Sequence, residues 1–343
     1  MKIFIQILLI LIIFLRTGNL LSDNYLFNVN NVRLEKKDNI SHKQLTNQAI
    51  KKAFNNLIKK ILVKEDVQKV SDLKFEEIRE LVAYYNISKN LEKKKNEINF
   101  SFTFDKDKIH NLFYKRGVLY SNVTEKEFYI LPILSSENEI FIFSNNYFYK
   151  DWKTTNNEEL IEFILPLENI EIIQKINQSK NSLLDIDINS LLKEYPKENI
   201  AIAIIENNET KKNKVYLKTR VQGKIISRSI NLDKNSFIDQ EETILKIKEE
   251  ITNLVKSQNL IDIRTPSFLN IRLNLNKKNN LVLLNSKIKK VDLIENIFIQ
   301  EFNKNFVNLR VKYLGKLDKI ISQLREENIS LELINDKWVI KIL

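Results

Sequence analysis

The sequence predicts an α+β protein in which three small mixed α/β units follow an N-terminal signal segment. Apolar residues recur at helical spacing in some stretches and alternate at strand spacing in others. The chain has 343 residues, of which 43% are hydrophobic, and this is enough for two or three globular cores. The one long apolar run at the N-terminus is too short to cross a bilayer as a helix.

Residues 1–22 have the pattern of a secretory signal peptide. An almost uniformly apolar stretch from Ile3 to Leu15 lies between Lys2 and Arg16. Its length fits a signal core of about 7 to 15 residues and falls short of the about 20 that a spanning helix needs. We therefore expect export to the periplasm and a mature chain that begins at Asp23, with an uncleaved N-terminal membrane anchor as the alternative.

The first folded unit is expected over residues 23–121 as a small α+β domain. Ser41 is placed to cap a long helix with one broad apolar stripe. Two alternating stretches within residues 82–104 predict paired strands. Asp105 then caps a helix that Gly117 ends in a left-handed turn.

The second unit, residues 125–262, reads as a central α/β domain. The apolar run from Asn199 to Ile205 is typical of a strand that is covered on both faces. The stretches on either side of Gln222-Gly223 predict a hairpin, and a long amphipathic helix is expected from Gln240 to Val255.

The third unit, residues 263–343, has the order strand, helix, two strands, helix and a final hairpin, which is βαββαβ-like and therefore ferredoxin-like. We expect Trp338 to close its core. This unit carries 15 Lys+Arg against 8 Asp+Glu, a net charge of +7.

Composition excludes several kinds of chemistry. The chain has no Cys, so disulfides, thiolate zinc sites, iron–sulfur clusters and thiol nucleophiles are excluded. Only 4 glycines are present, too few for several phosphate-binding loops. The net charge of +11 is nearly all lysine, whereas arginine is the residue that grips phosphate bidentately, so we expect no nucleic-acid partner.

Candidate catalytic residues are few, and each has a structural interpretation. His42 follows a helix cap, and His110 is expected to pair with Asp107 on a helix surface. Asp187 imitates part of a calcium loop, but Ser190 stands where that loop needs glycine, so we expect Asp187 to cap a helix. We therefore expect neither a metal nor a cofactor.

Two clusters offer sharper alternatives. The adjacent carboxylates could supply an acid and a base for glycoside cleavage, although exposed helix faces explain them better. These are Glu158-Glu159, Glu241-Glu242 and Glu249-Glu250. A dense aromatic segment is interpreted as core packing or, alternatively, as a contact surface for a peptide or glycan. Its residues in that second interpretation are Tyr147, Phe148, Tyr149 and Trp152.

Three segments of the chain resemble a bacterial exported family that is catalogued as domain of unknown function 2066. They are Gln48 to Phe54, Phe102 through Gly117, and Tyr313 through Trp338, in that order. The resemblance would span most of the mature chain. It implies an exported bacterial protein, and it implies no catalytic residues.

Together these features predict an exported, non-catalytic envelope protein that binds other envelope proteins or cell-wall components. The alternative is a carboxylate-based cell-wall hydrolase. A third possibility, association with a membrane surface through the basic last unit, would need its lysines to cluster on one face. Otherwise we expect membrane contact only through an uncleaved N-terminal segment.

Export gives a direct prediction. Residues 1–40 fused to a reporter that is active only outside the cytoplasm should produce reporter activity, because the segment carries a basic start and a short apolar core. A fusion that replaces Ile10 and Leu11 with Asp should lose that activity. A wild-type fusion that stays cytoplasmic would contradict the prediction.

Overall fold

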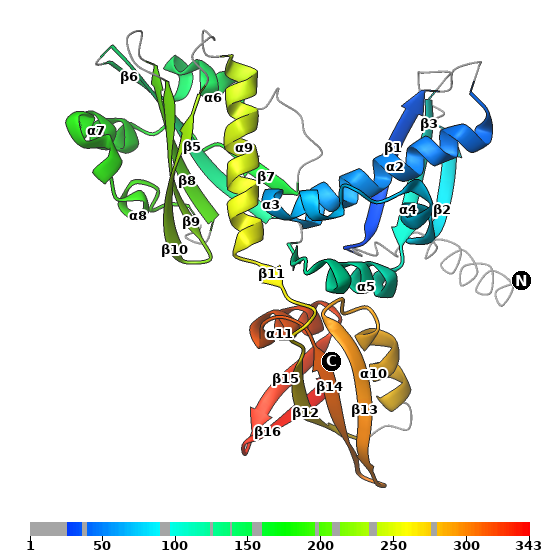
Figure 1. Cartoon of the computed structure of the whole chain (residues 1–343). Helices are drawn as coiled ribbons and strands as arrows, with labels where there is room; N and C mark the ends of the chain where they lie inside the picture. The colour runs from blue at the N-terminus through cyan, green and yellow to red at the C-terminus, as the bar shows by residue number, and fades with distance from the viewer. Residues whose placement is uncertain are drawn as a thin grey trace, which may run out of the picture. The chain divides into compact units, whose positions relative to one another are not determined.

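The computed structural model describes residues 26–35, 40–89, 97–123, 126–137, 139–152, 160–195, 199–207, 213–232, 239–275 and 280–343 (Figure 1). The chain is α+β, as predicted. It divides into two compact units. The first contains the described parts of Met1–Leu57, Leu73–Gly117 and Asp262–Leu343, and the second contains Ile58–Asp72 and Val118–Ile261. The N-terminal and C-terminal segments therefore share one unit, and the independent folding of three units stays a prediction.

The N-terminal part of the first unit is a three-stranded antiparallel sheet with helices. The sheet order is β1-β3-β2, and the strands are β1 (Asn28–Glu35), β2 (Val82–Lys89) and β3 (Glu97–Phe104). The helices are α2 (His42–Ile61), α4 (Phe75–Glu80) and α5 (Lys106–Arg116). Local signals start and stop these helices as predicted. Ser41 exchanges hydrogen bonds with Gln44 at the start of α2, Asp105 accepts from the Lys108 amide, and Gly117 has a φ of 62°.

The C-terminal part of this unit is a five-stranded sheet of order β13-β14-β12-β16-β15. Its strands are β12 (Ser267–Asn274), β13 (Ile294–Phe302), β14 (Phe306–Tyr313), β15 (Ile329–Ile334) and β16 (Lys337–Ile342), with the helices α10 (Asn280–Ile288) and α11 (Leu317–Glu326). The order of elements follows the ferredoxin-like prediction. The sheet differs from that pattern because β16 inserts, parallel to β12, between the first strand and β15.

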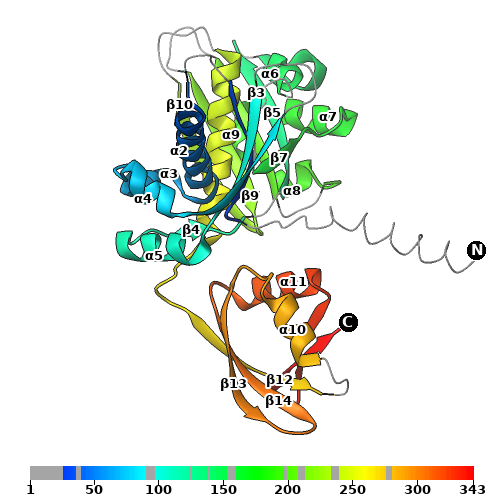
Figure 2. The ribbon, with the colours of Figure 1, turned by 90° about the vertical axis from the view of Figure 1, so that its right-hand side faces the viewer.

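Helices cover one face of this five-stranded sheet (Figure 2). Leu284 of α10 and Leu324 of α11 are buried against the apolar side of the strands. Trp338 lies at the end of the final hairpin on the same side of the sheet as the buried Ile271 and Ile340, as predicted, but its side chain is only partly buried. Trp338 pairs with Leu333 near the turn of the last hairpin, and Leu333 itself is 56% exposed, so this end of the hairpin extends past the helices.

The second unit is built on a mixed sheet of order β10-β9-β8-β5-β6, with β7 paired to β5. Its strands are β5 (Lys126–Ser136), β6 (Glu139–Phe141), β7 (Ile161–Ile164), β8 (Asn199–Asn207), β9 (Lys214–Val221) and β10 (Lys224–Asn231). A short second sheet pairs β4 (Tyr120–Ser121) with β11 (Leu260–Ile261). The predicted hairpin between β9 and β10 is confirmed, since Gln222 and Gly223 both have positive φ.

Helices pack on both faces of the central sheet (Figure 1). The helical elements are α3 (Lys64–Val67), η2 (Gln68–Val70), η3 (Phe143–Asn145), α6 (Tyr147–Asp151), α7 (Ile170–Gln178), η4 (Lys180–Asp185), α8 (Ile188–Leu191) and α9 (Gln240–Ser257). One apolar cluster joins α9 to residues such as Ala201 and Ala203, and another joins α7 and α8 to Ile200 and Ile202. Strand β8 is therefore covered on both faces, as predicted.

Lys256 of α9 is a buried cation in the second unit. Its ammonium group donates hydrogen bonds to the carbonyl oxygens of Lys59, in the last turn of α2, and of Leu62, which directly follows that helix. Burial lowers the pKa of Lys256 to about 8, against the opposing effect of Glu249. The side chain therefore acts as a helix C-terminal cap.

The described helices include none that combines the length and apolarity needed to cross a membrane. The apolar segment from Ile3 to Leu15 lies outside the described residues.

The C-terminal sheet gives a prediction about stability. Leu273→Ala should destabilise the full chain by about 2 to 5 kcal/mol, because Leu273 is 1% exposed beneath the helices. Phe298→Ala should cost about 1 kcal/mol or less, because that ring is 48% exposed on the other face. Urea unfolding of both variants tests this, and equal losses would show that the second face is also covered.

Candidate functional site: the open face of the C-terminal sheet

The uncovered side of the five-stranded sheet is the candidate site, and we call it the open face. Alternate residues of a strand point to opposite sides, so Ile271 and Leu273 of β12 face the helices while Arg272 faces away. On β14, Val307 and Leu309 are likewise buried beneath the helices. The open face is defined by Phe268 and Arg272 of β12, Phe298 of β13, and Phe306, Asn308 and Arg310 of β14.

Two arginines on the open face stack on phenylalanine rings. The Arg272 guanidinium carbon lies 4.0 Å from the ring centroid of Phe306, and that of Arg310 lies 4.3 Å from the centroid of Phe268. Both pairs join β12 to β14, whose register places Arg272 opposite Asn308. Stacking uses the flat face of a guanidinium, while its N–H donors lie along the edge.

A hydrogen-bonded chain holds one of these arginines in place. The Arg272 Nε donates to the Asn308 side-chain oxygen at 3.0 Å. The Asn308 side-chain nitrogen in turn donates to a carboxylate oxygen of Glu301 on β13. Arg272 is therefore oriented before any ligand arrives, which reduces the entropy lost on binding.

Large apolar side chains on this face remain open to solvent. Phe268 is 47% exposed and Phe298 is 48% exposed. Ile334, on the same side of β15 as Glu332, is 40% exposed. Exposed apolar groups gathered among basic ones are typical of an interaction surface.

The spacing of phenylalanine and arginine in the sequence indicates this face, although the charge count alone does not. Within β12 and β14, phenylalanine and arginine occupy positions of the same parity, namely Phe268 with Arg272 and Phe306 with Arg310. Reading each strand with a two-residue period would have grouped them. Pairing the two strands across the sheet required the tertiary structure.

The four aromatic residues predicted as an alternative contact surface lie mostly in the core. Phe148 is 0% exposed and Trp152 is 1% exposed, both within the cluster beneath α9. Tyr147 and Tyr149 are partly buried, and the Tyr149 hydroxyl donates to the Pro166 carbonyl oxygen at 2.7 Å. These positions fit the core-packing interpretation.

His110 is buried, which corrects the prediction that it lies on a helix surface. Its Nδ1 lies 3.3 Å from a carboxylate oxygen of Glu295 at the start of β13. Lys106 lies 3.4 Å from the same oxygen and also donates to the Asp292 carbonyl oxygen at 2.7 Å. The Phe27 ring packs edge-on against the imidazole. This cluster connects α5 to the C-terminal sheet within the first unit.

Glu295 stays ionised in this cluster. Burial on its own raises the pKa of Glu295, but the hydrogen bond from His110 and the charges of Lys106 and His110 outweigh burial and bring the pKa to about 2. A permanently charged carboxylate between two basic groups is suited to holding structure. It is poorly suited to general acid catalysis at neutral pH.

The carboxylate pairs show no facing arrangement in the described helix α9. Glu242 forms an ion pair with Lys246 at 2.7 Å, and Glu249 forms one with Lys64 at 3.1 Å. Both glutamates are exposed, as the helix-face interpretation predicted. The pair Glu158-Glu159 lies outside the described residues.

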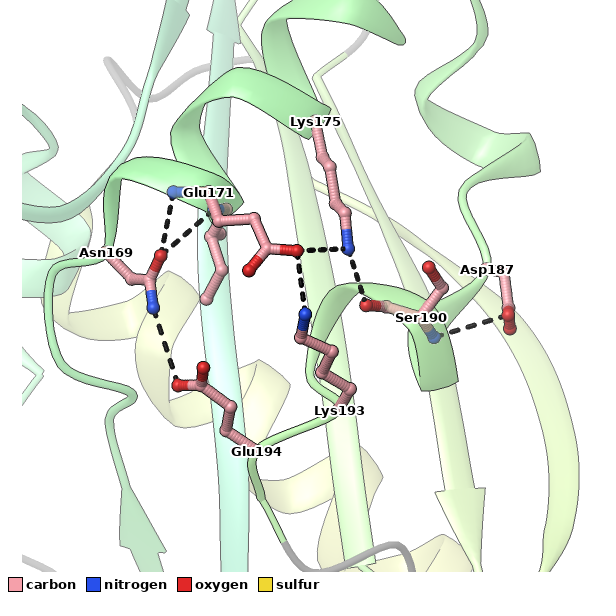
Figure 3. Close-up of polar contacts among 8 residues, drawn as sticks. Asn169, Glu171, Lys175, Asp187, Ser190, Lys193 and Glu194 are labelled. Atoms are coloured by element: carbon pink, nitrogen blue, oxygen red, sulfur yellow. Dashed lines mark hydrogen bonds and ion pairs between the residues drawn. The ribbon is translucent and has the colours of Figure 1, made fainter.

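A polar network links α7 to α8 in the second unit (Figure 3). Glu171 accepts from Lys193 at 2.9 Å and from Lys175 at 3.1 Å, and hydrogen bonding to Lys193 and then Lys175 lowers the pKa of Glu171. Lys175 also donates to the Ser190 carbonyl oxygen at 3.0 Å. A hollow beside the network has a cavity volume of only about 10 Å³, far below the roughly 300–1,000 Å³ of a typical ligand pocket. Its lining is Asn169, Glu171, Ile172, Leu191, Lys193, Glu194 and Tyr195.

The part of the chain that the structure describes contains no group of three or more His, Asp or Glu side chains placed to hold a metal ion. Asp187 caps α8, as predicted, by accepting from the amides of Asn189 and Ser190.

Neither a protein-family model nor a curated protein matches this chain. The resemblance of the three segments to domain of unknown function 2066 therefore stays a prediction.

The Glu295 cluster predicts how stability depends on pH. The pKa of Glu295 falls from 4.5 to about 2 on folding, so its contribution is complete above pH 4.5 and is lost as the pH falls toward 2. Glu295→Gln should remove up to about 3 kcal/mol of this acid-dependent stability. Urea unfolding across that pH range measures it.

Glu332→Gln is the matched control for this measurement, because the ion pair between Glu332 and Lys341 is exposed. It should leave the acid dependence almost unchanged. An acid dependence that is equal in wild type and Glu295→Gln would show that Glu295 is not held in its charged form by His110 and Lys106.

Proposed function

We propose that the chain is an exported, non-catalytic envelope protein that binds another component of the cell envelope through the open face. The observation that carries this proposal is the open face itself. It presents exposed phenylalanines and two stacked arginines on one side of a sheet, and aromatic and arginine side chains are the usual anchors of a binding surface.

Export is supported by the sequence of residues 1–22, whose short apolar core lies between Lys2 and Arg16. The resemblance to the exported family points the same way. Periplasmic localisation is therefore part of the proposal.

A binding role is also supported by the state of the titratable residues in the described chain. His110 is buried beside Glu295, and Glu242 and Glu249 are engaged with lysines on the surface of α9. A cell-wall hydrolase would need two carboxyl groups across a substrate cleft, about 5 to 10 Å apart. No observation on the described residues favours that alternative.

The proposal predicts that position 298 touches a partner in cells. A photo-crosslinking amino acid that replaces Phe298 in the full chain should form an adduct with an envelope component after irradiation. The exposed ring position tolerates such a replacement, because it does not contribute to the core. Mass spectrometry of the adduct identifies whether the component is protein, glycan or lipid.

The same crosslinking residue at Ser227 on β10, which is exposed in the second unit, is the matched control. Adding Arg310→Gln should weaken the adduct at position 298 and leave any adduct at 227 unchanged. An exported chain that forms no adduct at position 298, or forms the same adducts at both positions, would refute binding through the open face.

A further inference from the structure

We propose that the open face binds the surface of an anionic phospholipid bilayer. This inference rests on the proposed function, because it names the envelope component as the membrane itself. It also departs from the sequence-based expectation that only an uncleaved N-terminal segment would contact a membrane. Association of the last unit with a membrane surface requires its basic side chains to cluster on one face, and the strand registers show on which side of the sheet they lie.

The charges on this side of the sheet are mostly positive. The strand registers place Lys312, Lys337 and Lys341 on the same side as Arg272 and Arg310. The carboxylates placed on that side are Glu301 and Glu332, and Lys341 pairs with Glu332 at 2.7 Å. The excess of cations complements a lipid surface that carries negative charge.

The apolar groups of the face suit the boundary between lipid headgroups and acyl chains. Phe268 and Phe298 are each nearly half exposed, and Ile334 extends the apolar area toward β15. Phenylalanine and isoleucine side chains have no polar group to satisfy, so they can enter that boundary without losing hydrogen bonds to water. Because they lie on one side of the sheet, several of them can enter together.

The stacked arginines are arranged for phosphate. A guanidinium that lies on a ring keeps the N–H groups along its edge available as a planar fork, and this geometry matches phosphate oxygens. Arg310 is exposed and lies over Phe268, so the headgroup-binding group and the inserting ring are neighbours. Basic and apolar contacts would therefore form on the same lipid.

The same stacking disfavours single-stranded nucleic acid, the other polyanion that aromatic sheets bind. Bases bind such sheets by stacking on open aromatic faces. On this sheet Arg272 lies over the Phe306 ring and Arg310 lies over the Phe268 ring. Base stacking on Phe306 or Phe268 would first have to displace a guanidinium group.

The test uses the full chain and exploits its lack of cysteine. Asn296→Cys places one thiol on the exposed open side of β13, opposite Lys312, where it can carry an environment-sensitive fluorophore. Ser227→Cys, on exposed β10, carries the same fluorophore as a control. Insertion of the N-terminal segment into a vesicle would bring both labels to the membrane, so a response specific to position 296 reports binding through the open face.

Vesicles of phosphatidylcholine mixed with phosphatidylglycerol should shift the emission of the label at position 296 to shorter wavelength. Vesicles of phosphatidylcholine alone should not. Arg272→Gln combined with Arg310→Gln should weaken the response to anionic vesicles by roughly tenfold to thirtyfold, since each basic residue at such a surface contributes roughly a factor of five.

Two further variants separate loss of binding from loss of folding. Lys312→Gln with Lys337→Gln removes two charges from the face without touching the stacked pairs, and it should weaken the response by a similar factor. Lys224→Gln with Arg228→Gln removes two exposed charges from β10 and should have no effect.

Three results would overturn the inference. They are an equal response to neutral vesicles, an equal response of the label at position 227, and displacement of bound vesicles by an equimolar single-stranded oligonucleotide. The proposed function would survive each of them if position 298 still formed a specific adduct in cells. Absence of that adduct in an exported chain would instead refute the proposed function.

Discussion

Helices α10 and α11 cover one face of the five-stranded sheet, and the character of the candidate site depends on this constraint. Because side chains alternate along a strand, covering one face sends every second residue of β12 and β14 into solvent. Phe268, Arg272, Phe306 and Arg310 therefore share a surface, although no two of them are adjacent in sequence. The arginines in turn cover part of the rings that would otherwise be more exposed.

The central sheet differs from the C-terminal sheet because helices pack on both of its faces. Strand β8 is buried along most of its length, and the cluster beneath α9 takes in Phe148 and Trp152. A dense aromatic segment is therefore core in one sheet, whereas three spaced phenylalanines are surface in the other. The number of covered faces decides between these outcomes, and aromatic density alone does not.

Several charged side chains of this chain connect elements of the fold. Glu295 links His110 and Lys106 of α5 to the start of β13, and Glu171 links α7 to the segment after α8. Lys256 caps the end of α2 from within the core of the second unit. Removing one partner of a buried pair of this kind is costly, because the other charge is then left buried without its counter-charge.

The sequence by itself determined the class of the fold, most helix limits and the turns. The helix limits and turns follow from the sequence because the hydrogen bonds that set them join residues at most a few positions apart. The cap at Asp105, the stop at Gly117 and the turn at Gln222-Gly223 are examples. Only the tertiary structure decided that β16 inserts beside β12, that Glu295 reaches His110, and which face stays open. These outcomes depend on which distant strands and helices bury one another's apolar sides, and that competition is settled only when the whole chain packs.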